Sequence, residues 1–215
     1  MEHVTKSYGR RRVLDDIDLL LPTGSFNLLV GPNGSGKTTL LRIASTYARP
    51  TQGQVHWGQG DGTETSDARV ARPRIGYAGH VPLLYDELST REHLEFALRM
   101  RGASKSIAGQ GAAAWTSAFE VASRQEERVE TLSRGLRQRV ALAQAFAVRP
   151  EFLLLDEPAS NLDARGLEVL VDQLRQVRRA STVLIATHDP DPFRPLADRV
   201  LEVKDAKVQL WGERP

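Results

Sequence analysis

The chain has 215 residues, of which 40% are hydrophobic and 26% charged, and this composition is typical of a soluble globular domain with at most a small subdomain. It holds no cysteine, which excludes disulfides, thiolate catalysis and thiolate metal sites, and its formal net charge of +2 is too small to indicate a nucleic-acid partner. Its longest apolar runs are strand-sized, far below the roughly 20 residues that span a bilayer, and no secretory signal opens it, so we expect a cytoplasmic chain whose membrane role would need a partner.

Strands and turns alternate through the first third of the chain. Residues 13–19 partly alternate between apolar and polar side chains, which predicts a half-buried strand, and the apolar run 26–30 predicts another. A helix is expected over 38–47 because a proline closes it at position 50. Residues 58–72 are polar and rich in glycine, which indicates a surface loop, and a further strand is expected at 74–78.

The middle of the chain has helical character. Ser89 and Glu92 have the spacing of a helix capping box, and apolar residues on one helical face follow them. A second helix is expected over 112–121. We therefore interpret residues 82–131 as a helical insert.

Strands and helices alternate again after residue 132. A strand is expected at 152–155, a helix at 163–177 and a strand at 182–186. Continuous apolar strands that alternate with helices favour a parallel sheet covered on both faces.

A glycine-rich loop, GPNGSGKT, connects the strand 26–30 to the helix that follows it. Glycines let the backbone curl so that successive amides point at phosphate oxygens, and the helix N-terminus adds a partial positive charge. Lys37 is expected to reach the β- and γ-phosphates, and Thr38 to offer its hydroxyl to Mg²⁺. The predicted nucleotide-binding residues are Gly31, Pro32, Asn33, Gly34, Ser35, Gly36, Lys37, Thr38 and Thr39.

Two carboxylates follow the apolar strand 152–155, at the edge of a parallel sheet where ligands bind. Asp156 is expected to hold Mg²⁺ through water, and Glu157 to accept a proton from an attacking water; the alternative is that both cap the next helix. His188 follows the strand 182–186, a candidate neighbour of the acidic strand. We expect its imidazole near the γ-phosphate, although a lone histidine after a strand is more often structural.

Together these motifs resemble the ATP-binding subunit of an ABC transporter, over nearly the whole chain. The resemblance implies an α/β fold: a P-loop NTPase core with a mostly parallel sheet, a small antiparallel β subdomain and a helical subdomain. It implies one ABC ATPase domain over 1–215, in which 1–81 and 132–215 form the nucleotide-binding core and 82–131 the helical subdomain. It also implies ATP and Mg²⁺ as cofactors.

The resemblance assigns two further residues. Tyr8 lies 23 residues before Gly31, where the family places an aromatic ring that stacks on adenine. Without that spacing, an early tyrosine is more often a packing residue. Asp163 ends the segment Ser-Asn-Leu-Asp, which resembles the family's inter-subunit loop.

The segment 132–136, Leu-Ser-Arg-Gly-Leu, lies where the family carries Leu-Ser-Gly-Gly-Gln, the signature that caps the ATP of the other subunit in a head-to-tail dimer. A serine and the backbone amides that open the next helix form an anion site, so this trans contact is assigned to Ser133, Arg134 and Gly135. Arg134 adds a charge and Leu136 removes a polar contact, so dimer closure through this signature has to be tested.

His80 stands where most of the family has a glutamine that touches Mg²⁺ or the attacking water and links to the transporter subunit. A neutral imidazole can take part of that role, and the alternative is that His80 only packs or contacts the partner. The segments 75–80, 84–88 and 133–139 narrow the resemblance to the ATPase of the haem exporter of cytochrome c maturation.

The implied mechanism is a homodimer, or a pair with a similar ATPase, that closes around two ATP–Mg²⁺ on the inner face of the cell membrane. Glu157 polarises water, while His188 and His80 position the γ-phosphate. A separate transmembrane subunit receives the motion, and no nucleic acid is involved. The alternatives are the ATPase of another ABC exporter or importer, a soluble ABC ATPase, and a nucleotide-binding module that does not hydrolyse.

Overall fold

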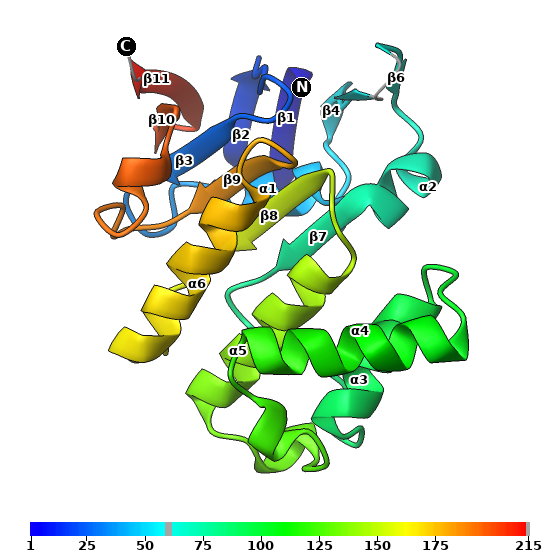
Figure 1. The fold of residues 1–215 in the computed structure, drawn as a ribbon. Helices are drawn as coiled ribbons and strands as arrows, with labels where there is room; N and C mark the ends of the chain where they lie inside the picture. The colour runs from blue at the N-terminus through cyan, green and yellow to red at the C-terminus, as the bar shows by residue number, and fades with distance from the viewer. Residues whose placement is uncertain (59–61, 214–215) are drawn as a thin grey trace.

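The apolar runs of the sequence become strands of a central sheet in the computed structural model, which describes residues 1–58 and 62–213 (Figure 1). Within these residues the sheet has six strands, in the order β11 (Lys207–Glu213), β10 (Arg199–Lys204), β3 (Phe26–Val30), β9 (Thr182–Ala186), β8 (Phe152–Asp156) and β7 (Ile75–Ala78). Neighbouring strands pair in parallel, except for the antiparallel hairpin of β10 and β11. The predicted mostly parallel sheet is confirmed, and the C-terminal hairpin is an addition to it.

Both faces of this sheet are covered. The helices involved are α1 (Lys37–Ala44), α3 (Thr90–Arg99), α4 (Lys105–Ala118), α5 (Arg134–Ala147) and α6 (Ala164–Val177). Leu28 of β3 belongs to an apolar cluster with α3, α4, α5 and α6, whereas the adjacent Leu29 belongs to a second cluster with α1. Alternate strand residues point to opposite faces, so the two clusters lie on opposite sides of the sheet. This explains why β3 and β9 are apolar and buried at nearly every position.

A smaller antiparallel sheet packs on the α1 side. Its strands lie in the order β2 (Arg11–Ile17), β1 (Glu2–Tyr8) and β4 (Gln52–Gln54). The predicted strand 13–19 therefore begins and ends two residues earlier, because β2 starts directly after the tight turn that pairs Tyr8 with Arg11. Val4 and Leu14 fill the space between this sheet and α1.

The prediction of one loop over 58–72 is wrong in part. Residues 59–61 lie outside the described residues. On either side of them, β5 (Trp57–Gly58) and β6 (Glu64–Thr65) pair as a two-stranded antiparallel ribbon. The carboxylate of Asp67 then accepts a hydrogen bond from the backbone N–H of Arg69 and begins the short helix α2 (Ala68–Ala71). Ala71 is fully buried, which gives α2 an inner face.

The helices of the middle segment begin at polar caps. In α3 the capping box is confirmed: Ser89 N–H donates to Glu92 Oε2 at 2.9 Å, and Glu92 N–H donates to Ser89 Oγ at 3.2 Å. The helix predicted over 112–121 is α4, which begins seven residues earlier because Ser104 caps it. The described residues also form short turns of 3₁₀ helix, which are η1 (Arg72–Arg74), η2 (Ala122–Arg124), η3 (Val129–Thr131) and η4 (Arg194–Leu196). Among the described residues, helices that combine the length and the apolar content needed to cross a membrane are absent.

Helix α5 rests directly on strand β7. A Cβ added to Gly76 would lie 2.1 Å from the carbonyl oxygen of Ala145, so only glycine allows this contact. The close approach fixes the height of α5 above the sheet.

We expect Gly76→Ala to lower the free energy of unfolding by about 1–3 kcal/mol, because the added methyl group overpacks the α5–β7 contact. Urea denaturation of the purified chain measures this. Gly212→Ala in β11, which has no heavy atom within 4 Å of the added carbon, is the matched control and should change stability little. Equal stability of the two variants would contradict the contact.

Candidate functional site

The predicted phosphate loop curls tightly between β3 and α1. Gly31 has φ 145° and Gly36, which precedes the first residue of α1, has φ 115°. A Cβ on Gly31 would lie 2.5 Å from the carbonyl oxygen of Val203. Both glycines are therefore required by the backbone path, which turns the N-terminus of α1 towards the loop.

The Lys37 side chain is held inside this loop. Its ammonium group donates to the carbonyl oxygens of Gly31 at 2.7 Å and Pro32 at 3.1 Å, and the side chain is buried. The Ser35 hydroxyl is also buried and has no hydrogen-bond partner among the described residues. A cation and a spare hydroxyl thus converge on the centre of the loop, as an anion site requires.

Asp156 lies at the end of β8 and is only 1% exposed. Within the described part of the chain, neither of its carboxylate oxygens accepts a well-formed hydrogen bond, although the Thr38 hydroxyl lies close to them. Burial and the adjacent Glu157 carboxylate raise the pKa of Asp156, whereas the Thr38 hydroxyl and the nearby His80 and Arg42 side chains act in the opposite direction. Buried carboxylates without partners are costly. The oxygens of Asp156 and Thr38 therefore fit a hard divalent cation as their missing partner.

Glu157 and His188 meet beyond the ends of two neighbouring strands. Strand β8 pairs with β9 so that Asp156 lies opposite Ala186, and His188 Nδ1 then lies 2.8 Å from Glu157 Oε2. The predicted neighbourhood of these two strands is confirmed. Glu157 has φ 50°, a left-handed conformation that is rare outside glycine and is common at functional sites.

A cavity of about 440 Å³ lies between the phosphate loop and the Glu157–His188 pair. It is lined by Arg11, Val13, Asn33, Gly34, Gly36, Lys37, Thr38, Thr39, His80, Glu157 and His188. The structure thus brings His80, Glu157 and His188 to the phosphate loop, as predicted from sequence. Arg11 and Val13 are not among the predicted site residues. Both lie on β2 of the antiparallel sheet, and the local sequence does not predict where that sheet packs. Tyr8 is exposed and does not line this cavity; its ring lies 5.0 Å from Lys6 Nζ.

The signature segment lies at the start of α5. Ser133 caps the helix by accepting a hydrogen bond from the backbone N–H of Leu136 at 3.3 Å. The side chain of Leu136 packs against a small buried cluster of Val121, Leu132 and Val140, which accounts for an apolar residue at this position. Arg134 lines a second cavity, and His80 lines both this cavity and the one at the phosphate loop.

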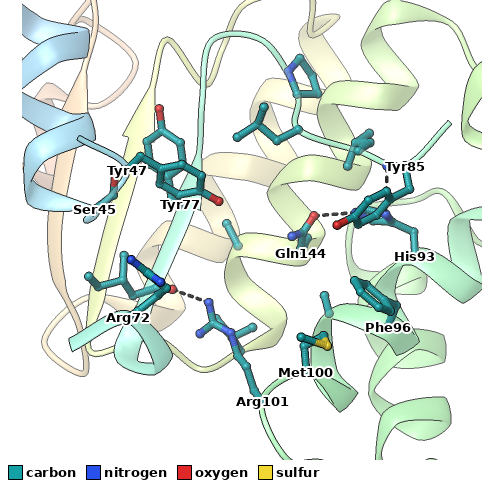
Figure 2. A pocket seen from close by; sticks show the side chains of 17 residues that line it. Ser45, Tyr47, Arg72, Tyr77, Tyr85, His93, Phe96, Met100, Arg101 and Gln144 are labelled. Atoms are coloured by element: carbon teal, nitrogen blue, oxygen red, sulfur yellow. Dashed lines mark hydrogen bonds between the residues drawn. The ribbon is translucent and has the colours of Figure 1, made fainter. Parts of the chain in front are cut away.

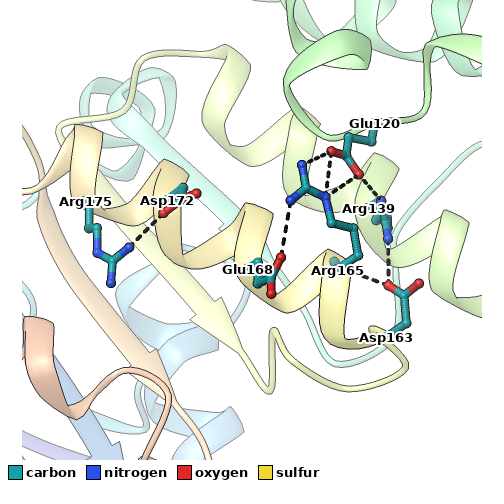
Figure 3. A network of polar contacts seen from close by, with 8 residues as sticks. Glu120, Arg139, Asp163, Arg165, Glu168, Asp172 and Arg175 are labelled. Carbon is teal, nitrogen blue, oxygen red and sulfur yellow. Dashed lines mark hydrogen bonds and ion pairs between the residues drawn. The ribbon is translucent and has the colours of Figure 1, made fainter.

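Asp163 precedes α6 and has two partners. Its Oδ1 accepts hydrogen bonds from the backbone N–H of Gly166 at 2.8 Å and from Arg139 Nη2 at 2.6 Å (Figure 3). These two bonds hold the end of the predicted inter-subunit loop within its own chain.

A third cavity, of about 550 Å³, lies where α3 meets β7 and α5, and we call it the insert groove (Figure 2). Its apolar and aromatic lining includes Tyr47, Tyr77, Leu83, Tyr85, Phe96 and Met100. His93 supports the groove: its Nε2 lies 2.6 Å from Gln144 Oε1, and burial lowers the pKa of His93. Arg101 closes one end by donating to the carbonyl oxygens of Pro73 at 2.7 Å and Ile75 at 2.6 Å.

The sequence is similar to known proteins over nearly its whole length. The family model described as ABC transporter matches residues 14–160. The chain is 31% identical over 214 residues to the Fe(3+) ions import ATP-binding protein FbpC 1 of Pectobacterium atrosepticum, covering 99% of the chain and 60% of that protein. It is 33% identical to the sulfate/thiosulfate import ATP-binding protein CysA 1 of Agrobacterium fabrum, covering 97% of the chain and 61% of that protein. The chain thus spans about 60% of the length of these curated relatives.

Solved structures match over the full chain. The dimeric post-hydrolysis state of the ATP-binding cassette MJ0796, bound to ADP and Pi, superposes with a TM-score of 0.90 at 28% identity, covering 100% of this chain and 98% of that one. A second dimeric structure of MJ0796, described as a bacterial ABC transporter cassette, gives a TM-score of 0.88 and covers 97% and 95%. Since the family model covers more than half of the chain and the phosphate loop, acidic strand end and histidine occupy one cavity, the chain belongs to the ABC transporter family.

Proposed function

We propose that this chain is the ATP-binding and ATP-hydrolysing subunit of an ABC transporter. The observation that carries the proposal is the meeting of the phosphate loop with the Glu157–His188 pair in one cavity. The curated relatives are named as ATP-binding proteins of importers, and a solved relative holds ADP and Pi, which supports the same reaction.

The chemistry follows from the placement of the side chains. The loop amides and Lys37 bind the phosphates, while Thr38 and Asp156 are the residues that would hold Mg²⁺, which would neutralise phosphate charge. Glu157 accepts one proton from a water whose oxygen attacks the γ-phosphorus, and the bond to the β-phosphate oxygen breaks to leave ADP and phosphate. His188, bonded to Glu157, orients that carboxylate, and His80 faces the same space from the end of β7.

The second half of each ATP site comes from another copy in this proposal. Ser133, Arg134 and Gly135 present the N-terminus of α5, where backbone amides attract phosphate. Leu136 points into the apolar cluster, so its departure from the family pattern leaves these amides in place. The solved relatives are described as dimeric, which supports a homodimer or a pair with a similar ATPase.

A transmembrane subunit is the proposed partner of the insert groove, with the chain held at the inner face of the membrane. The groove's aromatic and aliphatic lining suits a short amphipathic helix. For the cargo, the narrower prediction of haem export rests on segments 75–80, 84–88 and 133–139 alone. The relatives named above import iron(III) and sulfate by name and give haem export no support, so the proposal is the ATPase of an ABC transporter of undefined cargo.

Glu157→Gln should lower the rate of ATP hydrolysis by at least about 100-fold, because the amide cannot accept the proton of the attacking water. The variant should retain ATP and accumulate as a dimer in size-exclusion chromatography. Glu151→Gln, at the opposite end of β8 and paired with Arg74, is the control and should hydrolyse at the rate of the parent. Hydrolysis by Glu157→Gln at the parent rate would refute the role of Glu157.

Lys37→Ala should weaken ATP binding by at least about 100-fold, because the loop loses its only buried cation at the phosphates among the described residues. Fluorescence titration with a labelled nucleotide measures the affinity. Lys105→Ala, on the exposed first turn of α4, removes the same charge elsewhere and should leave affinity unchanged. An unchanged affinity in Lys37→Ala would overturn the assignment of the loop.

Phe96→Glu should release the chain from membranes that contain its transporter subunit, because a charge in the insert groove opposes apolar docking. The fraction of chain recovered in washed membranes is the readout, and ATP affinity should remain that of the parent. Ile107→Glu changes an exposed apolar residue of α4 outside the groove and is the matched control. Retention of the Phe96→Glu chain in membranes would show that the partner binds elsewhere.

A further inference from the structure

A network of ion pairs joins segments that are far apart in the sequence (Figure 3). Arg139 in α5 lies at its centre, with Nη2 at 2.6 Å from Asp163 Oδ1 and Nη1 at 3.3 Å from Glu120 Oε2. Glu120, just after α4, also accepts from Arg165 Nε at 2.9 Å. The network therefore connects the helical insert, the signature helix α5 and the start of α6.

The central guanidinium is covered while its partners reach water. The Arg139 side chain is 11% exposed, against 36% for Glu120 and 70% for Asp163. A covered guanidinium without partners would be strongly unfavourable, so this arginine favours the arrangement that keeps both carboxylates in place. Hydrogen bonds from Arg165 and, to a smaller extent, from Arg139 lower the pKa of Glu120, which favours the ionised form of this carboxyl group.

The contact at Asp163 leaves no spare room. Its carboxylate also caps α6 through the Gly166 N–H at 2.8 Å. A Cβ on Gly166 would lie 2.9 Å from Asp163 Oδ1 and 3.1 Å from Arg139 Nε. The first turn of α6, the loop end and the guanidinium thus form one close-packed unit.

Helix α5 also holds the rest of the loop that follows Glu157. Gln138 Nε2 donates to the carbonyl oxygen of Pro158 at 3.2 Å. A Cβ on Gly135 would lie 2.7 Å from the carbonyl oxygen of Asn161, so the signature turn touches the loop backbone there. Residues 158–163 are therefore tied to α5 at both ends and in the middle.

We infer that Arg139 is a positioning residue: by binding Asp163 and Glu120 together, it fixes the loop 158–163 to the signature helix and orders the surface through which two chains close over ATP. The inference rests on the proposed function, because it concerns dimer closure. It adds that the helical insert, through Glu120 and Arg165, supports the geometry of that surface. A helix cap alone would need Asp163 but not Arg139.

Hydrogen exchange in the monomer tests the ordering of the loop. In Arg139→Ala, the backbone amides of residues 159–163 should exchange at least about tenfold faster than in the parent. Arg139→Lys, which keeps the charge but cannot bind both carboxylates through one planar group, should fall between the two. Arg175→Ala is the matched control, because Arg175 pairs with Asp172 at 2.8 Å elsewhere on α6, and it should leave these amides unchanged (Figure 3).

Dimer closure tests the consequence. In the Glu157→Gln background with ATP, Arg139→Ala should raise the dimer dissociation constant about tenfold in sedimentation velocity, while nucleotide affinity measured at concentrations too low for dimers stays within twofold. Asp163→Asn retains the cap, since asparagine is as good an N-cap as aspartate, but it replaces the ion pair with a neutral hydrogen bond. It should therefore weaken the dimer in the same direction as Arg139→Ala, and by less. The double variant should be no weaker than Arg139→Ala alone, because the contact between Arg139 and Asp163 is already lost in that variant.

Several results would each overturn the inference. They are unchanged exchange in Arg139→Ala, an unchanged dimer constant in the same variant, or additive effects of Arg139→Ala and Asp163→Asn. A lower melting temperature with unchanged exchange and dimerisation would show a purely structural residue and would overturn it as well. If the Glu157→Gln parent binds ATP but forms no dimer, the proposed dimer is refuted by that result, and the exchange experiment still decides the role of Arg139 in the loop.

Discussion

The parallel pairing of β8 with β9 is the constraint on which the site depends. The register that places Asp156 opposite Ala186 sets the acidic strand end beside the segment that carries His188, and β9 in turn lies beside β3, which leads into the phosphate loop. Three strand ends from distant parts of the chain therefore deliver their polar residues to one edge. A shift of one residue in either pairing would turn these side chains to the wrong face.

The site is built to be completed by its ligand. Among the described residues, the buried carboxylate oxygens of Asp156 accept no well-formed hydrogen bond, and the ammonium of Lys37 donates to carbonyl oxygens of its own loop. A cation at Asp156 and a phosphate in the loop would give each of these charged groups a partner of opposite charge. Glu157 adds a left-handed backbone conformation, which the packed strand end and its hydrogen bond to Ala186 hold in place.

Local sequence predicted the parts that depend on local physics. The glycine loop, the buried strand at 182–186 and the Ser89–Glu92 capping box appear as predicted, because each is specified by neighbouring residues. The start of α4 was predicted seven residues late. Its glycines disfavour a helix, yet a Cβ on Gly111 would lie 2.7 Å from Leu98 Cδ1, so close packing of α4 on α3 favours glycine there.

The contacts of α5 were not predicted from the sequence, because they form between elements that lie far apart along the chain. Helix α5 carries the signature at one end, contacts Gly76 of the sheet near the other, and holds the loop after Glu157 through Gln138 and Arg139. One helix thus carries the signature segment at its start and contacts the loop that follows Glu157. Because the interior is close-packed, a displacement at one end of this helix would disturb the contacts at its other end.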